Sequence, residues 1–229
     1  MNIRRAKGRP PTALVTREKI ADASLEIISE VGYEKLTMAR IARRVGVGPS
    51  ALYNHVAGKD GLLLLIEDAL MTRVDDSALD AALAGETDPA IALKTWARSY
   101  RDVFAEHTPL VEVIARAPIS GAPGTVAMYE KVAELFSRSG VPDAQILSRI
   151  IMVESFIYGS VFDVHAPQNI FAVPTELAPS APALSRARRA WAEDLCIDLT
   201  APDTRPNPFA DDPFTLGLDK LLGDIWSAN

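Results

Sequence analysis

The chain has 229 residues, of which 48% are hydrophobic and 24% are charged. A hydrophobic fraction of this size supplies a buried core, which excludes a wholly disordered chain. The single cysteine, Cys196, excludes an internal disulfide framework. No apolar run approaches the roughly 18 residues of a membrane span, and no hydrophobic signal segment follows the basic N-terminus. We therefore expect a cytoplasmic protein with no membrane partner.

Charge is distributed unevenly along the chain. The net charge is −6, yet residues 1–60 carry 11 Lys and Arg against 6 Asp and Glu, whereas the remainder carries 13 against 24. A basic head on an acidic body is the asymmetry expected when one end of a protein faces phosphate groups. A solvated basic tail would account for the first few arginines and lysines but not for the motif that follows them.

Caps, prolines, glycines and apolar periodicity predict helices along most of the chain. The first begins near Thr16, runs to Val31 and ends at Gly32. Half of the 16 prolines fall between Pro167 and Pro213, which predicts loop over much of that stretch. Neither strand alternation nor an internal repeat is present, so we expect an all-α fold. The other predicted helices cover residues 37–45, 49–55, 59–74, 89–106, a short stretch after 109, 124–138, 142–162, 184–195 and the chain from 213 onward.

Residues 37–55 combine the features of two short helices that cross closely. Ala42 supplies the small side chain needed at the crossing, and Gly46 tolerates the positive φ of a tight turn. The arrangement leaves the side chains of the second helix pointing outward, into solvent or into a DNA major groove. The segment is therefore predicted to be a helix-turn-helix. The apolar residues that hold it against the first helix are Ile41, Val45, Val47 and Leu52.

The sequence resembles the tetracycline repressor (TetR) family over residues 16–70. The most specific part, Leu52-Tyr53-Asn54-His55-Val56-Ala57-Gly58-Lys59-Asp60-Gly61-Leu62-Leu63, is similar to that family's Leu-Tyr-x-His-(Phe/Val)-x-x-Lys-x-x-Leu-Leu signature. Gly32-Tyr33, Leu36-Thr37 and Ile41-Ala42 also match the family's usual beginning. The resemblance implies a basic flexible arm (1–15), an N-terminal three-helix helix-turn-helix DNA-binding domain (16–61) and, joined to it by a long helix, a helical effector-binding and dimerisation domain (62–229).

The resemblance and the residue chemistry together assign DNA contacts. At the start and exposed side of the second short helix, base edges would meet Pro49, Ser50, Ala51 and Asn54. Phosphate contacts that fix the register suit Thr37, Tyr53, His55 and Lys59. His55 could equally be a packed, hydrogen-bonded residue, and basic side chains on an exposed helix are often simply solvated. The further basic residues expected at DNA are Arg44 and, in the arm that would enter the minor groove, Arg4, Arg5, Lys7 and Arg9.

Two segments, 145–162 and 214–226, are the best candidates for a dimer interface. The first is apolar on two sides, and Leu147, Ile151, Tyr158 and Phe162 form the second of these. Such a helix must be covered twice, by its own core and by something else, although a central core helix of a monomer stays possible. The residues expected at the interface are Ile146, Ile150, Val153, Ile157, Phe214, Leu218, Leu221, Leu222 and Ile225.

A ligand pocket is expected in the helical body. Glu154 lies in an apolar run, where a buried carboxylate needs a partner or a ligand. For each polar candidate, a satisfied core or surface residue is the alternative. The histidines and Cys196 show no metal-ligand spacing, so neither a metal nor a cofactor is expected. The residues expected to line the pocket are Trp96, Tyr100, Phe104, His107, Met128, Tyr129, Met152, Glu154 and Tyr158.

These observations favour a transcriptional regulator, most simply a repressor. It would bind a near-palindromic DNA operator as a homodimer, because two-fold dimers place two recognition helices about 34 Å apart. An unidentified small-molecule effector would release it from the operator. No nucleophile elbow, phosphate loop or paired carboxylates occur, which disfavours an all-α enzyme. An architectural DNA-binding protein without an effector is the other alternative.

Overall fold

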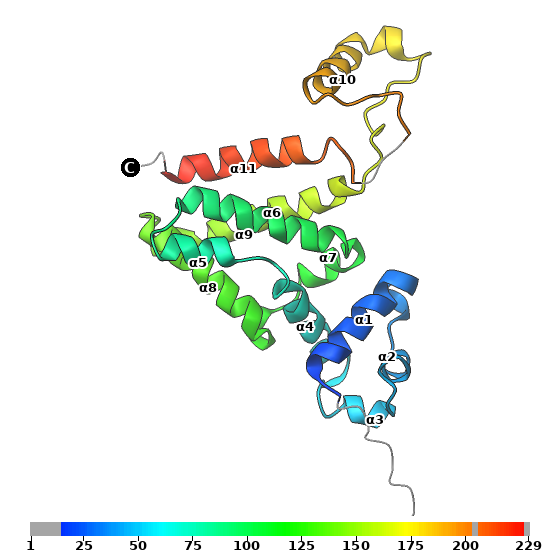
Figure 1. Cartoon of the computed structure of the whole chain (residues 1–229), viewed down its shortest axis with the longest axis vertical. Helices are drawn as coiled ribbons and strands as arrows, with labels where there is room; N and C mark the ends of the chain where they lie inside the picture. The colour runs from blue at the N-terminus through cyan, green and yellow to red at the C-terminus, as the bar shows by residue number, and fades with distance from the viewer. Residues whose placement is uncertain (1–14, 203–205, 227–229) are drawn as a thin grey trace, which may run out of the picture. The chain divides into compact units, whose positions relative to one another are not determined.

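The computed structural model describes residues 15–202 and 206–226, with side chains described as far as residue 223. Within these ranges all regular structure is helical and no strand occurs, which confirms the predicted all-α fold. The chain divides into two compact units (Figure 1). Unit 1 contains the chain up to Arg73 together with residues 109–129, and unit 2 contains residues 74–108 together with the chain from Glu130 onward.

Unit 1 begins with α1 (Arg17–Val31), which the sequence delimits at both ends. The Thr16 hydroxyl accepts a hydrogen bond from the backbone N–H of Lys19 (3.3 Å), and the helix ends at Gly32, whose φ is 85°. The buried side of α1 packs against α2 and α4. The other elements that begin in this unit are η1 (Tyr33–Lys35), α2 (Met38–Val45), α3 (Pro49–Leu52), α4 (Gly58–Met71), η2 (Ile119–Gly121) and α8 (Pro123–Arg138), and most of α7 (Thr108–Ile114) also belongs to it.

The helix α4 also joins the residues around the start of α8. The Asp68 carboxylate accepts a hydrogen bond from the backbone N–H of Thr125 (3.0 Å), and so satisfies a free donor at the start of that helix. Gly124 permits this approach, because a Cβ there would lie 2.6 Å from Cγ2 of Thr72. The domain boundary expected after residue 61 therefore falls inside α4, a helix that packs along its length in unit 1.

Unit 2 is built around α6 (Pro89–Ala105). Asp88 caps this helix, since its carboxylate accepts hydrogen bonds from the N–H groups of Ala90 (2.8 Å) and Ile91 (3.2 Å). Trp96, Tyr100 and Phe104 of α6 are fully buried, and the helix packs against α5, α9 and α11. The other elements of this unit are α5 (Ser77–Leu83), which was not predicted, the second half of α8, α9 (Asp143–Val164), η3 (Ala178–Ser180), α10 (Pro182–Asp194) and α11 (Asp211–Trp226).

The helix α9 meets the length and composition criteria of a membrane span, contrary to the prediction that no apolar run approaches that length. It has 22 residues and a mean hydropathy of 1.2 over its most apolar stretch. The core helix of a folded protein meets the same criteria, and one such helix is weak support for a membrane protein. Ile150, Val153 and Ile157 of α9 are buried within unit 2, while Glu154 hydrogen-bonds to tyrosines there. The structure therefore describes α9 as a helix with one side in the core of unit 2 and the other side uncovered.

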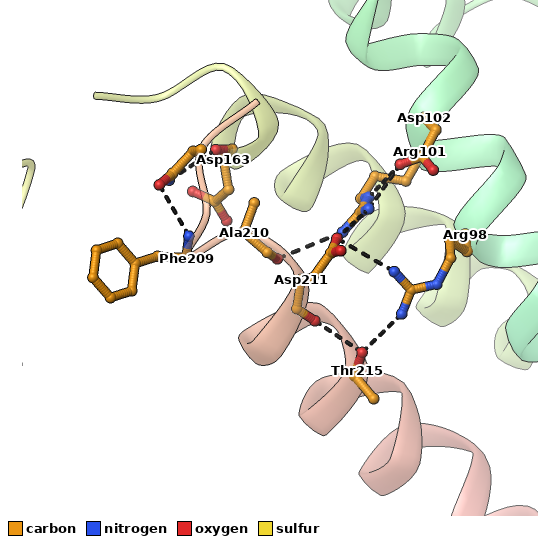
Figure 2. A network of polar contacts seen from close by, with 9 residues as sticks. Arg98, Arg101, Asp102, Asp163, Phe209, Ala210, Asp211 and Thr215 are labelled. Carbon is orange, nitrogen blue, oxygen red and sulfur yellow. Dashed lines mark hydrogen bonds and ion pairs between the residues drawn. The ribbon is translucent and has the colours of Figure 1, made fainter. Parts of the chain in front are cut away.

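A buried arginine fixes the segment that leads into α11 (Figure 2). The Arg101 side chain is 4% exposed, and its guanidinium pairs with the carboxylates of Asp102 (2.7 Å) and Asp211 (2.6 Å). It also lies 4.3 Å from the centre of the Phe214 ring. Desolvation would raise the pKa of Asp211, but the hydrogen bond and charge of Arg101, helped by Arg98, outweigh it and hold that pKa below its ordinary value.

Candidate functional site

The turn between α2 and α3 has the geometry of a helix-turn-helix. Gly46 adopts the left-handed conformation (φ 80°, ψ 32°), and the Val47 N–H donates to the carbonyl of Ala42 (2.9 Å) at the end of α2. Ala42 is 1% exposed, and Leu52 is fully buried. The predicted helix-turn-helix is therefore confirmed. The second helix is shorter than predicted, because α3 ends at Leu52 and the following residues form a turn.

The residues predicted to meet base edges lie on the uncovered side of α3 and the turn after it. Pro49, Ser50 and Asn54 are exposed, and Ala51 is half-buried. Leu52 points the other way and is buried against the rest of the unit. One hydroxyl and one carboxamide are thus presented together with two small apolar groups. This combination can donate and accept hydrogen bonds at base edges and can contact a thymine methyl group.

The residues predicted to contact phosphate lie at the start of α2, after the end of α3 and at the start of α4. Thr37 is exposed, and its hydroxyl caps α2 by accepting from the N–H of Arg40 (3.3 Å). Tyr53 is 59% exposed. Lys59 is exposed near the start of α4, and its Nζ lies 5.1 Å from the centre of the Tyr33 ring. Residues 37–59 contain no Asp or Glu, and besides Arg44 they contain Arg40, Arg43 and Lys59, whose positive charge attracts an anionic backbone.

His55 is half-buried and is linked to α1 through its backbone. Its carbonyl oxygen accepts a hydrogen bond from Nη1 of Arg17 (3.0 Å). Arg17 was not among the residues predicted from the sequence, although its position carries a signal. A cation in the first turn of a helix is disfavoured by the helix dipole, which indicates that another contact compensates for it. Arg17 ties the end of the recognition segment to the first helix.

Arg44 differs from the other basic residues predicted at DNA. Its guanidinium forms ion pairs with the carboxylates of Glu30 (2.6 Å) and Glu26 (2.8 Å), both on α1. The hydrogen bonds with Glu30 and Glu26 raise the pKa of Arg44. The structure thus favours a role in holding α2 on α1 over a phosphate contact. Arg4, Arg5, Lys7 and Arg9 lie outside the described residues, so their contact with DNA stays a prediction.

In unit 2, three of the predicted pocket residues form a polar cluster. The hydroxyls of Tyr100 and Tyr158 each donate to Oε1 of Glu154 (3.0 Å), and the two hydroxyl oxygens are 2.8 Å apart. Tyr100 is fully buried, and its ring contacts those of Trp96, Phe104 and Tyr158 with centroid distances of 4.8–5.8 Å. The indole N–H of Trp96 is buried and has no hydrogen-bond partner among the described residues. The prediction that the Glu154 carboxylate needs a partner is met by two tyrosines.

The remaining predicted pocket residues are less closely grouped. His107 and Met152 are half-buried in unit 2, whereas Met128 and Tyr129 belong to unit 1. Within the ranges that the structure describes, no group of three His, Cys, Asp or Glu side chains could hold a metal ion.

The predicted dimer residues require a correction. On α9, Ile146, Ile150, Val153 and Ile157 are 0–9% exposed because they face the core of their own unit. The uncovered side of this helix instead presents Leu147 (71% exposed), Ile151 (59%) and Phe162 (56%). The two apolar sides were recognised from the sequence, and the side assigned to a partner is the one that is buried within its own unit. On α11, the predicted residues Phe214, Leu218 and Leu222 are likewise buried, and Leu221 is half-buried. The side chain of Ile225 lies outside the described residues. The exposed apolar residue of this helix is Leu216, which is 58% exposed.

Two family profiles match the chain. The profile described as "Bacterial regulatory proteins, tetR family" covers residues 20–66, which contain the helix-turn-helix. The profile described as "Tetracyclin repressor-like, C-terminal domain" covers residues 84–193. Among curated relatives, the HTH-type transcriptional repressor DrrR1 of Streptomyces coeruleorubidus is 31% identical over 156 residues. The match includes 68% of this chain but spans only 56% of the length of DrrR1.

Solved structures share the fold over nearly the whole chain. The TetR family protein ActR of Streptomyces coelicolor, in complex with actinorhodin, aligns with a TM-score of 0.66 and 21% identity, over 94% of this chain and 97% of ActR. BioQ with its double-stranded DNA operator aligns with a TM-score of 0.58 and 19% identity, over 93% of this chain and 99% of BioQ. The profiles, the relative and the shared architecture agree: the chain belongs to the tetR family of bacterial regulatory proteins.

Proposed function

We propose that the protein is a transcriptional repressor that binds a near-palindromic duplex operator as a homodimer and is released by a small-molecule effector. The observation that carries this proposal is the surface of α3 and the turn after it, where Ser50, Tyr53 and Asn54 are exposed in a segment without acidic residues. DrrR1 is named a repressor, and BioQ was solved with its DNA operator, which supports the same role here. A regulator of this kind acts in the cytoplasm, where the operator is located.

In the proposed complex, base-edge contacts and phosphate contacts come from different residues. Ser50 and Asn54 read base edges, since they carry the hydrogen-bonding groups of the exposed side of α3. Thr37, Tyr53 and Lys59 contact phosphates on either side and fix the register. Arg17 holds the carbonyl of His55, so the recognition segment keeps its orientation when it meets the groove.

The homodimer is proposed to form through the uncovered sides of α9 and α11, which are packed neighbours in unit 2. Leu147, Ile151 and Phe162 on α9 and Leu216 on α11 are all more than half exposed. Burying such residues against a second copy removes apolar surface from water, at about 25 cal/mol for each Å². An isologous contact of this kind also repeats the DNA-reading surface about a two-fold axis, as a near-palindrome requires.

The effector is proposed to bind at the cluster of Tyr100, Glu154 and Tyr158. A buried N–H without a partner costs about 1–3 kcal/mol, and the Trp96 indole is such a group beside this cluster. A ligand oxygen that accepts from this indole would recover that free energy. ActR was solved with actinorhodin, which supports ligand binding in a body of this fold. Release from DNA then requires that the effector bind one conformation of the dimer better than the other.

A sequence selection on random duplex DNA tests the proposed function. The full chain is expected to enrich a near-palindromic site, whereas Asn54→Ala is expected to relax the preference at one base pair in each half-site, at a cost of about 1–3 kcal/mol. Asn169→Ala removes another exposed carboxamide, which lies in unit 2, and should leave the selected sequence unchanged. Failure of the wild-type chain to enrich any sequence contradicts the proposal, as does an Asn54→Ala variant that selects the wild-type site.

A further inference from the structure

Unit 2 contains a cavity of about 300 Å³ that shares no lining residue with the Tyr100–Glu154–Tyr158 cluster. We call it the α10 cavity. Its walls come from the end of α9, from α10 and from the segment that leads into α11. Its volume falls at the lower end of the range for small-molecule sites. The lining residues that determine its chemistry are Asp163, Phe171, Arg188, Trp191, Asn207 and Phe209.

Hydrogen bonds fix the wall that joins α9 to the segment before α11. Asn207 is 7% exposed, and its Nδ2 donates to the carbonyl of Asp163 (3.1 Å), while its Oδ1 accepts from the N–H of Phe209 (3.1 Å). The backbone N–H of Asn207 also donates to the carbonyl of Val164 (2.7 Å). The carboxamide of Asn207 is therefore used to hold the wall. It gives the cavity a defined shape before any ligand arrives.

The Arg101 network anchors the same wall from the α6 side (Figure 2). Arg101 donates to the carbonyl of Ala210 (3.5 Å) and pairs with Asp211 (2.6 Å), the two residues that directly follow Phe209. On the opposite wall, the Trp191 indole N–H donates to the Asp212 carboxylate (2.8 Å). The Trp191 and Phe209 rings then meet at a centroid distance of 4.5 Å. An aromatic corner is thus held rigidly by buried or paired groups.

Two charged side chains complete the lining. Arg188 of α10 is half-buried, and its guanidinium has no hydrogen bond or ion pair with any other residue that the structure describes. Asp163 is the other charged group, and desolvation raises its pKa although the charge of Arg101 acts in the opposite direction. The Arg188 guanidinium is therefore available to a ligand, whereas Asp163 is an exposed carboxyl group that water can hydrate. An unpaired guanidinium beside aromatic rings favours an anionic ligand over an amine.

We propose that the α10 cavity binds a small planar aromatic acid. The carboxylate of the acid pairs with Arg188, and its ring packs against Trp191, Phe209 and Phe171. The planar guanidinium fork matches a carboxylate in two parallel hydrogen bonds. The aromatic corner accepts a flat ring by edge or offset contacts. A hydroxyl on that ring can donate to Asp163, so a hydroxy acid fits the lining better than a simple acid. This site is separate from the proposed effector cluster, and binding of the acid does not depend on DNA.

Isothermal titration calorimetry of the full chain with 3-hydroxy-2-naphthoate tests this site, with 3-hydroxy-2-naphthamide as the uncharged counterpart. The wild-type chain is expected to bind the acid with a dissociation constant below about 1 mM and at least about tenfold more tightly than the amide. Arg188→Ala should weaken binding of the acid by at least about tenfold and remove the preference over the amide. Arg186→Ala removes an exposed arginine from the same helix and should change neither affinity beyond about twofold.

The proposal is overturned if the wild-type chain does not bind the acid at about 1 mM, the weakest affinity expected of a preformed site. It is also overturned if the chain binds the acid and the amide equally, or if Arg188→Ala behaves like Arg186→Ala. Arg188 is not part of the hydrophobic core of α10, and circular dichroism checks that both variants are folded. Tyr100→Phe and Glu154→Gln should leave the affinity for the acid unchanged. A loss of affinity in those variants would place the acid at the effector cluster and would also overturn the proposal. Because the titration contains no DNA, a failed operator selection and a failed acid titration are separate outcomes.

Discussion

Replacing Arg101 by alanine is expected to destabilise unit 2 substantially, because this one side chain links α6 to α11. It pairs with Asp102 on its own helix and with Asp211 at the start of α11, and its guanidinium lies 4.3 Å from the Phe214 ring. Its own side chain is 4% exposed. The substitution would release the segment before α11 from α6 and leave a space beside the Phe214 ring.

The size of the effect depends on how well water replaces each lost contact. The Asp102 and Asp211 carboxylates are 53% and 67% exposed, so they become hydrated and each lost pair costs only about 0.5–1 kcal/mol. The contact with the Phe214 ring contributes about 1 kcal/mol. Two methylene groups leave a buried position, at about 0.8 kcal/mol each. The free energy of unfolding should therefore fall by about 4 kcal/mol.

Urea denaturation followed by circular dichroism measures this loss, at one fixed protein concentration because the proposed dimerisation would contribute to the apparent stability. Arg101→Met keeps the methylene groups and should cost about half as much as Arg101→Ala. Arg98→Ala is the matched control: its side chain is 42% exposed and also pairs with Asp211, and it should cost about 1 kcal/mol or less. An Arg101→Ala variant no less stable than Arg98→Ala would refute the reasoning.

Three further predictions concern acid stability, the α4–α8 contact and the dimer. The Asp211 pKa is lowered on folding, so its contribution to the free energy of unfolding is complete above the ordinary pKa of about 3.9 and is lost as the pH falls through the lowered pKa. Asp211→Asn should therefore flatten the acid part of a curve of urea midpoint against pH. An unchanged slope there would contradict this. Gly124→Ala should lower the free energy of unfolding, measured by urea denaturation, by about 1–3 kcal/mol. The added Cβ would lie 2.6 Å from Thr72 and 3.0 Å from Asp68. A variant as stable as the wild type would argue against this close approach. Ile151→Lys places a charge on the uncovered side of α9 and should yield a folded monomer in analytical ultracentrifugation; a dimer of wild-type stability would exclude this side as the interface.

Local chemistry was sufficient to predict the helix-turn-helix. Thr37 as a cap, Ala42 at the crossing and Gly46 at a positive φ each act within a few residues of their own position, so their roles can be recognised from neighbouring sequence. The helix α5 was missed for a related reason. It has only seven residues, and Asp76 precedes it without forming a side-chain capping bond, so it carries little local signal.

Features that depend on distant partners could not be predicted. Ile150 and Ile151 are equally apolar neighbours on α9, and only the packing of α6 decides that the first is buried and the second exposed. Arg101 resembles any helical arginine until Asp211, 110 residues later, lies beside it. The α10 cavity likewise joins Asp163 at the end of α9, Arg188 of α10 and Phe209 of the segment before α11, which lie far apart in the sequence.

The most direct test of the proposed function is the affinity for the selected operator duplex, measured by fluorescence anisotropy for the wild-type chain and for Tyr53→Ala. Tyr53 is 59% exposed, so its removal should leave folding and dimerisation intact. The wild-type chain should bind the selected duplex at least about 10³-fold more tightly than a random duplex. Tyr53→Ala should bind the selected duplex at least about tenfold more weakly, because a phosphate contact is lost in each half-site. Equal binding to both duplexes by the wild-type chain, or wild-type affinity in Tyr53→Ala, would contradict the account.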